Sequence, residues 1–229
     1  MSLNTSSFVV YIFCAYRDWT LQLYQQLSEK HKRKIILVKS PKKLKYNYIK
    51  KINPKYIFFP DWSWIVPKDI INDFTCICIH ESELPKFRGG SPLQNQIIRG
   101  IKKTKSTAFV MTEKLDDGDI ILQKNLSLSG SIKDIFERMK KNDFEIINKV
   151  ISGNYKRRKQ KGKSTIFKRR QPKDSELKDL NHSKDYLYNF IRMLEEPYPN
   201  AFIRIGNKKI IFKSAKLKAN KLTFQGEIE

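Results

Sequence analysis

The feature that most constrains the fold is a regular alternation of short apolar runs with amphipathic runs in the first 150 residues. Four apolar runs are typical of buried strands: 7–14, 34–40, 56–60 and 76–79. Two runs between them have helical periodicity: 18–30, which begins at an Asp cap, and 67–74. Strands that alternate with helices build a mostly parallel sheet with helices on both faces. Ligands of such sheets bind beyond the carboxyl ends of the strands.

The alternation continues after residue 90. We expect a helix that Ser91 caps, with Pro92 in its first turn and Gly100 at its end. The remaining elements before residue 154 are two strands and a long helix: 106–113, 119–128 and 131–153. The predicted class is therefore α/β, with a Rossmann-like sheet covered by helices on both faces, followed by a small C-terminal β-rich subdomain.

Positive charge is the strongest feature of the composition. The 229 residues include 46 Lys and Arg against 23 Asp and Glu, a net charge of +23. Such a charge fits polyanionic partners such as nucleic acid, phosphorylated ligands or anionic lipid, and equally a solvated basic surface. The stretch 153–173 holds ten basic residues and no acid. We interpret it as a linker or exposed loop, which divides the chain into a catalytic domain at 1–153 and a basic linker, helix and short β subdomain at 154–229.

Several classes of protein do not fit the sequence. No apolar run approaches the roughly 20 residues that span a bilayer, and the first residues lack the features of a signal peptide. Three cysteines, an odd number, fit a reducing compartment better than a disulfide framework. We therefore expect a cytoplasmic protein without a membrane partner.

A lone histidine, His80, stands where the fourth apolar run ends. Because side chains alternate along a strand, Cys76, Cys78 and His80 share one face. A hydrogen-bonded structural histidine is one interpretation. A zinc site is weaker, because a fourth ligand and the usual ligand spacing are missing. A nucleophilic pair of Cys78 and His80 needs an orienting third group and an oxyanion hole. The strand-end position, the Pro–Gly loop and the carboxylates downstream favour a functional histidine.

The second candidate is KLDDGDI, which contains Asp116, Asp117, Gly118 and Asp119. Taken alone it is typical of an ordinary turn, because Asp and Gly supply the backbone angles that turns require. It also places carboxylates in a loop between neighbouring strands. One of them can then converge with His80 to hydrogen-bonding distance, which proton transfer at a reacting amine requires.

These residues carry a resemblance to a known family. IHESELPKFRGGSPLQNQIIRGIKKTKSTAFVMTEKLDDGDIILQ resembles the signature of the formyltetrahydrofolate-dependent formyltransferases: Asn-x-His, Leu-Pro-x-x-Arg-Gly-x-x-Pro and Leu-Asp-x-Gly-Asp. RRQPKDSELKDL and YNFIRMLEEPYPNAF resemble the region that follows the catalytic domain in the tRNA-modifying and sugar-modifying members. The resemblance covers the chain from about FFPDWSWIVP to Phe202 and is closest to the nucleotide-sugar N-formyltransferases.

The resemblance implies a formyl donor, N10-formyltetrahydrofolate, and catalytic roles for three positions. His80 polarises the formyl group and helps to move protons, and Asp116 accepts the amine proton through an ordered water. Cys78 occupies the position of the asparagine that stabilises the oxyanion in the family. A thiol is a weak donor compared with an amide. Either another donor replaces the asparagine, such as a backbone N–H of 86–90, or the chemistry is slow, or the function has drifted. Of the possible roles for Cys78 itself, we expect that of a spectator.

The resemblance also implies a slot for the folate pterin near the third and fourth strands. Trp62 and Trp64 line it on this interpretation, and are core residues on the alternative one. No metal is expected. The predicted cofactor-binding residues are Trp62, Trp64, Ile65, Arg88, Gly89, Gly90, Leu115, Asp117, Gly118 and Asp119.

The expected acceptor is the primary amine of a nucleotide-linked amino sugar. Only 27 residues follow Phe202, too few for the full β-barrel of the methionyl-tRNA formyltransferases. With such an acceptor, basic residues are expected to face its diphosphate. Aromatic residues either stack on its nucleobase or pack the C-terminal tail against the catalytic domain. The predicted substrate-binding residues are Arg169, Arg170, Arg192, Tyr198 and Phe202. Two alternatives are a methionyl-tRNA formyltransferase-like protein and a catalytically weakened paralogue that binds nucleic acid through 153–173. A homodimer is left open.

Overall fold

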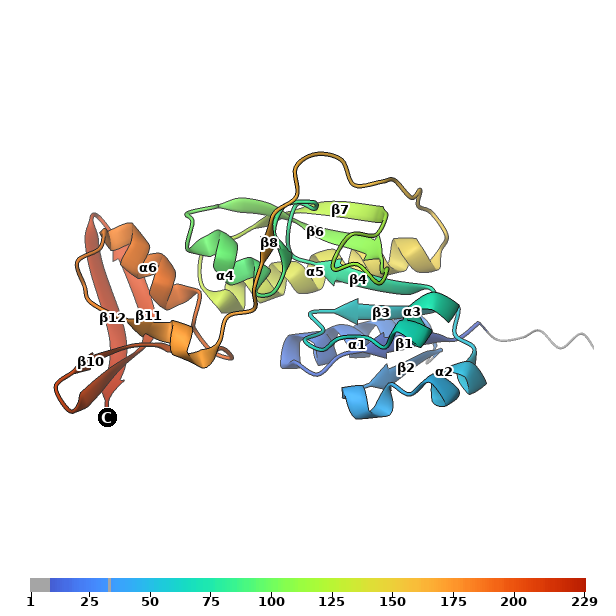
Figure 1. Ribbon diagram of the computed structural model, residues 1–229, viewed down its shortest axis with the longest axis horizontal. Helices are drawn as coiled ribbons and strands as arrows, with labels where there is room; N and C mark the ends of the chain where they lie inside the picture. The colour runs from blue at the N-terminus through green and yellow to red at the C-terminus, as the bar shows by residue number, and fades with distance from the viewer. Residues whose placement is uncertain (1–8, 33) are drawn as a thin grey trace, which may run out of the picture. The chain divides into compact units, whose positions relative to one another are not determined.

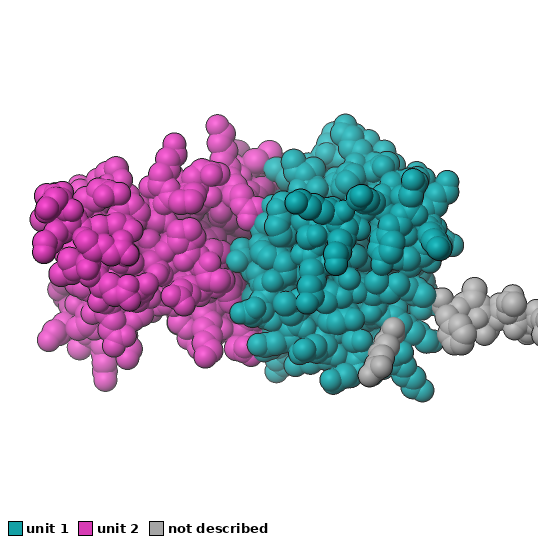
Figure 2. All heavy atoms as spheres, turned by 90° about the horizontal axis from the view of Figure 1, so that it is seen from below, with its two compact units in different colours: residues 1–80, 106–124, 139–162 teal, residues 81–105, 125–138, 163–229 magenta. Residues whose placement is uncertain are grey.

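The computed structural model describes residues 9–32 and 34–229 (Figure 1). The chain forms two compact units, coloured separately in Figure 2. Unit 1 comprises 1–80, 106–124 and 139–162, and unit 2 comprises 81–105, 125–138 and 163–229. The boundary predicted after residue 153 stays a prediction.

A six-stranded sheet has the order β2-β1-β3-β4-β6-β7. Its strands are β1 (Tyr11–Cys14), β2 (Ile35–Val38), β3 (Tyr56–Pro60), β4 (Cys76–His80), β6 (Lys103–Val110) and β7 (Ile120–Ser127). The first four are parallel, and β6 is antiparallel to β4. The mostly parallel α/β class is thus confirmed. The predicted run 7–14 begins at residues that lie outside the described part of the chain.

Helices lie on both faces of this sheet. They are α1 (Asp18–Lys30), α2 (Tyr46–Ile52), α3 (Lys68–Asp73) and α5 (Ile132–Ile151), with a short 3₁₀ turn η1 (Pro41–Lys43). Ile12 of β1 belongs to the core cluster that includes Ile49 of α2 and Ile70 of α3. The next residue, Phe13, points the other way and contacts the Tyr24 ring of α1 at 6.0 Å. The alternation along β1 therefore separates α2 and α3 from α1.

Helix α1 matches its predicted range, but its cap differs. Arg17 occupies the N-cap position and makes no side-chain cap bond, whereas Asp18 lies in the first turn. A carboxylate there still stabilises the positive end of the helix dipole. The side of α1 also packs beside α5, because His31 Nε2 lies 2.8 Å from Asn148 Oδ1.

One carboxyl group is fully buried in unit 1. Asp143 of α5 is 0% exposed, and neither of its carboxyl oxygens has a hydrogen-bond partner. Burial, with a smaller contribution from the charge of Asp61, raises the pKa of Asp143 well above its usual range. The protonated form is therefore favoured in the folded chain, because an ionised carboxylate without partners is costly to bury.

Unit 2 contains the predicted C-terminal β-rich part. Its four-stranded sheet, of order β12-β11-β10-β9, carries α6 against β11 (Figure 1). The elements are α4 (Pro92–Ile97), η2 (Pro172–Ser175), β9 (Glu176–Leu177), α6 (Lys184–Arg192), β10 (Ala201–Ile205), β11 (Lys208–Lys218) and β12 (Lys221–Ile228). Strands β5 (Arg88–Gly89) and β8 (Ile166–Phe167) form a separate parallel pair.

Across residues 9–32 and 34–229, no helix is both long and apolar enough to cross a lipid bilayer.

Candidate active site

His80 lies at the carboxyl end of β4, as the sequence predicts. Its side chain is largely buried, at 6% exposure, and its backbone is opposite Thr107 of β6. The imidazole Nδ1 is 3.8 Å from Asp116 Oδ2. This distance is slightly longer than a hydrogen bond. Hydrogen bonds between catalytic side chains are often long in an unliganded protein and shorten when substrate binds. The predicted convergence of a histidine and an aspartate is therefore present in unit 1.

Asp116 belongs to the aspartate loop, residues 115–119, which connects β6 to β7. Its backbone has φ of +49°, the left-handed region that few residues other than glycine adopt, although Asp is among those that do. Gly118 lies so close to β6 that a Cβ would stand 1.6 Å from the Val110 oxygen. Val110 N donates to Asp119 O at 3.0 Å, and the Asp119 carboxylate pairs with Lys159 Nζ at 3.0 Å. The loop is thus fixed at several points.

The predicted pterin slot contains an aromatic cluster. The Trp64 ring lies 4.5 Å from the Tyr16 ring and 4.8 Å from the Trp62 ring. Trp62 packs against the core cluster, as the alternative interpretation predicts. Trp64, Ile65 and Leu115 are exposed, at 40%, 94% and 59%. Large apolar side chains exposed on loops mark surfaces that bind ligands or partners.

The three cysteines are free thiols. Burial raises the pKa of Cys76 to about 12, and it also raises the pKa of Cys14. Cys78 is partly exposed and packs against the same core cluster that contains Cys76. The two side chains thus share a face, as the alternation predicts. Within the described residues no cluster of three or more His, Cys, Asp or Glu side chains is arranged to hold a metal ion.

The glycine loop, residues 86–90, belongs to unit 2 and differs from the prediction. Its amide groups already have acceptors. Phe87 N donates to Thr165 Oγ1, Arg88 N to Thr165 O, and Gly90 N to Phe167 O, at 2.8, 2.8 and 2.9 Å. Lys86 N donates to Glu83 O at 3.0 Å. Because they are engaged in this way, these four amides argue against the expectation that backbone donors of this loop replace the family's asparagine.

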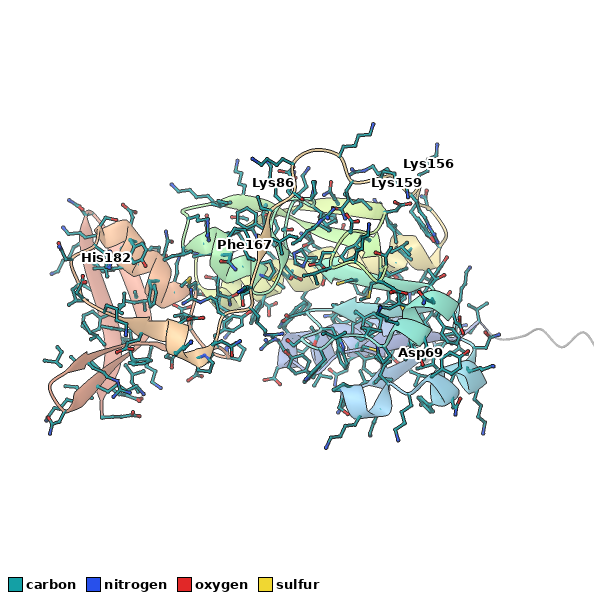
Figure 3. All side chains as sticks on the ribbon, in the orientation of Figure 1. Asp69, Lys86, Lys156, Lys159, Phe167 and His182 are labelled. Carbon is teal, nitrogen blue, oxygen red and sulfur yellow. The ribbon has the colours of Figure 1, made fainter. Side chains whose placement is uncertain are left out.

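The loop glycines are required by the chain that pairs with them. A Cβ on Gly89 would lie 2.3 Å from Phe167 O, and one on Gly90 would lie 2.4 Å from Arg169 Cα. The Phe167 ring, labelled in Figure 3, stacks on Phe87 at 5.2 Å. Close approach of two backbones explains the glycines without a bound ligand.

The predicted substrate-binding residues also lie in unit 2, and their surroundings differ. Arg192 is 5% exposed, and its guanidinium donates to Leu128 O, Gly130 O and Asn189 Oδ1. Arg170 is partly buried, donates to Asp174 O and lies over the Phe190 ring. These contacts are structural and argue against a role for either arginine in binding a diphosphate.

The other three differ from one another in exposure and contacts. Arg169 is exposed. Tyr198 makes an edge contact with Phe136 at 6.1 Å, so it packs the tail. Two cationic groups lie over the Phe202 ring: Lys209 Nζ at 4.9 Å and Arg204 Cζ at 5.5 Å from its centroid.

The sequence analysis missed two groups of residues in unit 1. The first surrounds Asp61, after β3, whose Oδ2 pairs with Arg17 Nε at 2.7 Å and accepts from Trp19 Nε1 at 3.3 Å. Its position after a parallel strand is a signal that sequence alone provides. The second is Gln160, in the basic stretch, for which the sequence offers no signal. Its Nε2 donates to Asp116 O and Gly118 O.

A cavity of about 660 Å³ is bordered by the aspartate loop and by the segment that follows α5. Lys159, which Figure 3 labels on that segment, is one of its lining residues. The others are Val110, Thr112, Glu113, Lys114, Asp117, Gly118, Asp119, Arg157 and Gln160. Its lining holds three acidic and three basic side chains, so it has no excess of either charge.

The fold and the site define an α/β protein whose mostly parallel sheet brings a histidine and an aspartate together beyond a strand end, where ligands of such sheets bind. The chain belongs to the formyltransferase family, because the Formyl transferase profile matches residues 32–151. A second profile, Methionyl-tRNA formyltransferase, C-terminal domain, matches residues 172–229. The family predicted from the motifs is thus confirmed.

Individual relatives agree with this assignment. The bifunctional polymyxin resistance protein ArnA of Wigglesworthia glossinidia brevipalpis is 33% identical over 83% of this chain and 30% of its own length. The methionyl-tRNA formyltransferase of Clostridium novyi is 31% identical over 75% of this chain and 58% of its own. The chain therefore spans between about a third and three fifths of these curated relatives.

Solved structures extend the comparison. A methionyl-tRNA formyltransferase from Clostridium thermocellum is 37% identical, with a TM-score of 0.92 over 96% of this chain and 99% of that one. A sugar N-formyltransferase from a Shewanella species is 19% identical, with a TM-score of 0.72 over 92% of this chain and 99% of that one. The second similarity is one of fold alone.

Proposed function

We propose that this chain transfers a formyl group from N10-formyltetrahydrofolate to a primary amine. The observation that carries the proposal is the approach of His80 to Asp116, at 3.8 Å, within the family's motif. The donor fits the exposed apolar side chains of Trp64, Ile65 and Leu115, because a flat pterin needs an apolar slot. Trp62, Asp117, Gly118 and Asp119 complete the proposed donor site.

The reaction assigns a role to each member of the pair. An uncharged amine attacks the formyl carbon, and an oxyanion forms on the formyl oxygen. His80 stabilises this oxyanion by donating a hydrogen bond, and Asp116 accepts the proton that the amine releases. Collapse of the intermediate breaks the bond to N10 of the folate, and N10 takes up the proton that Asp116 had accepted, so the pair returns to its starting protonation state. Positioned acid–base groups of this kind typically contribute about 10²- to 10⁴-fold to the rate.

For the acceptor, we favour the methionyl group of a charged tRNA over an amino sugar. Support comes from the 37% identity to the Clostridium thermocellum enzyme and from the C-terminal domain profile at 172–229. A net charge of +23 suits a polyanion. The solved Clostridium thermocellum chain is matched over 99% of its length.

A nucleotide-linked amino sugar is the second candidate. It is supported by a sugar N-formyltransferase of the same fold whose chain is matched over 99% of its length. A catalytically weakened paralogue that binds nucleic acid through 153–173 is the third, because Cys78 replaces the asparagine of the family's pattern. Arg169 and Phe202 are the predicted substrate-binding residues whose exposure or cation contacts still suit either acceptor.

The test is a formylation assay with N10-formyltetrahydrofolate and two sets of acceptors. One set is methionyl-tRNA, and the other is a panel of nucleotide-linked amino sugars, with His80→Asn as the inactive control. Turnover with methionyl-tRNA alone supports the favoured acceptor, and turnover with a sugar alone selects the second. Absence of turnover with both, together with RNA binding that persists at physiological salt, would leave the weakened paralogue.

A further inference from the structure

The segment that follows α5 contributes directly to the shape of the aspartate loop. Ile120 N donates to Arg158 O at 2.8 Å, and Arg158 N donates to Ile120 O at 2.9 Å. This bridge places residue 160 beside the loop that precedes β7. All of these residues belong to unit 1. Of these, Arg158 and Gln160 lie between the two regions that the family profiles match, 32–151 and 172–229.

Gln160 makes the contact that matters for the loop. Its Nε2 donates to Asp116 O at 2.8 Å and to Gly118 O at 2.9 Å. An amide nitrogen has two hydrogens, and here each has its own acceptor. The two carbonyls lie on either side of Asp117, so one side chain fixes the peptide units around the turn. Gln160 is partly buried, whereas Arg157, Arg158 and Lys159 before it are exposed.

The loop needs such a contact at this position. Asp116 has φ of +49°, and a residue other than glycine in this region persists where its surroundings hold it there. Rotation of this backbone would swing the Asp116 carboxylate, which lies 3.8 Å from His80 Nδ1. A misplacement of about 1 Å at a reacting group can cost about 100-fold in rate.

We propose that Gln160 is a positioning residue. By donating hydrogen bonds to the backbone carbonyls on both sides of Asp117, it holds the Asp116 carboxylate toward His80. The inference rests on the proposed function for its effect on rate, and on geometry alone for its effect on the loop. On this proposal, the basic segment after α5 contributes to the active site through the uncharged side chain of Gln160 and not through its lysines and arginines.

The test compares two variants of Gln160 with a neighbour. Gln160→Leu removes both N–H donors but keeps a side chain of similar size. Gln160→Glu keeps the shape of the side chain but places carboxylate oxygens, which accept hydrogen bonds, against the two carbonyls. Lys161→Leu is the matched control, because residue 161 is exposed on the same segment. If Gln160→Leu fails to fold, Gln160→Glu provides the same measurement.

The first readout needs no activity. Amide exchange at 116–118 and the imidazole NMR signals of His80 are measured in the unliganded protein, which has only 3 histidines to assign. Both Gln160 variants are expected to raise exchange about tenfold or more and to shift the His80 signals, while Lys161→Leu changes neither. Unchanged exchange and unchanged His80 signals in both Gln160 variants would overturn the proposal.

The second readout is the rate of formyl transfer. We expect kcat to fall about 10- to 100-fold in the Gln160 variants while KM for the acceptor changes less than about threefold, because only the approach of Asp116 is altered. A rise in KM with unchanged kcat would overturn the positioning role. A wild-type chain without activity, combined with an altered loop in the variants, would refute the proposed function and leave the positioning intact.

Discussion

The aspartate loop of unit 1 and the glycine loop of unit 2 are both held by the chain that follows α5, but by different groups. Gln160 reaches the aspartate loop with a side-chain amide. The glycine loop is held by the backbone of residues 165–167, through bonds from Arg88 N to Thr165 O and from Gly90 N to Phe167 O. At Gly89 and Gly90 this segment comes so close that a Cβ would clash with its backbone, whereas the contact from Gln160 leaves room for the side chains of Asp116 and Asp117.

The difference separates two reasons for unusual residues in loops. Three N–H groups of the glycine loop donate to residues 165–167, and its two glycines meet the backbone of residues 167–169, so packing between two segments of the chain explains the glycines. The aspartate loop keeps the Asp116 carboxylate near His80. Both members of the proposed proton-transfer pair belong to unit 1, so substitutions in the two loops are expected to have different effects.

The largest expected effect is that of removing the charge in the aspartate loop. Asp116→Asn should lower the rate of formyl transfer about 10³-fold, because the proton acceptor is lost. Asparagine keeps the size of the side chain and tolerates the left-handed backbone, so the loop conformation is retained. Asp117→Asn is the matched control, with less than about tenfold loss expected. Initial rates with the acceptor found active give both numbers, and equal losses would indicate a turn requirement.

A smaller effect, on stability, is expected from the glycine loop. Gly90→Ala would place a Cβ 2.4 Å from Arg169 Cα, so β8 must move. We expect the free energy of unfolding to fall by about 2–3 kcal/mol, as for overpacked sites. Trypsin should then cut at 168–170 faster than in the wild type.

Gly100→Ala is the control for this change. A Cβ there meets no atom within 4 Å, and only its φ of +73° opposes alanine. The expected loss is about 1 kcal/mol, without faster cleavage at β8. If Gly100→Ala and Gly90→Ala have equal effects, the close approach of β8 is not what selects glycine in the loop.

Much of the fold could be predicted because its signals are local. The apolar run 56–60 became β3 with the same bounds, and the amphipathic run 18–30 became α1. Helix α2 was missed, since its sequence YNYIKKI buries only Ile49 completely and so has little periodicity. Pattern reasoning succeeds where an element buries a whole face and fails where tertiary contacts alone hold it.

The site divides in the same way. His80 and Asp116 could be found because a strand end and an Asp–Gly turn are visible in the sequence. Gln160 contacts the loop from about 40 residues further along the chain, and no local pattern encodes that contact. The glycine loop was assigned to a ligand because glycine looks the same in a sequence whether a ligand or another segment approaches it.

The smallest expected effects concern Cys78, because the hydrogen bonds of the glycine loop decide which groups can take over the role of the family's asparagine at this position. Because the amides of Lys86, Phe87, Arg88 and Gly90 have acceptors in unit 2, they are not free to replace the family's asparagine. On the proposed mechanism we therefore expect His80 to be the main donor to the oxyanion and the thiol of Cys78 to add little. Cys78→Ser should keep the rate within about threefold of the wild type.

The reciprocal change tests the same point in the other direction. Cys78→Asn restores the donor of the family's pattern, and we expect the rate to rise up to about tenfold, because a neutral hydrogen bond to a developing charge contributes on the order of 1.5 kcal/mol. Cys78 packs against the core cluster, so thermal melting is measured alongside the rate. Near-complete inactivation of Cys78→Ser, with protection of the wild type by substrate against a thiol alkylating agent, would instead assign the chemistry to the cysteine.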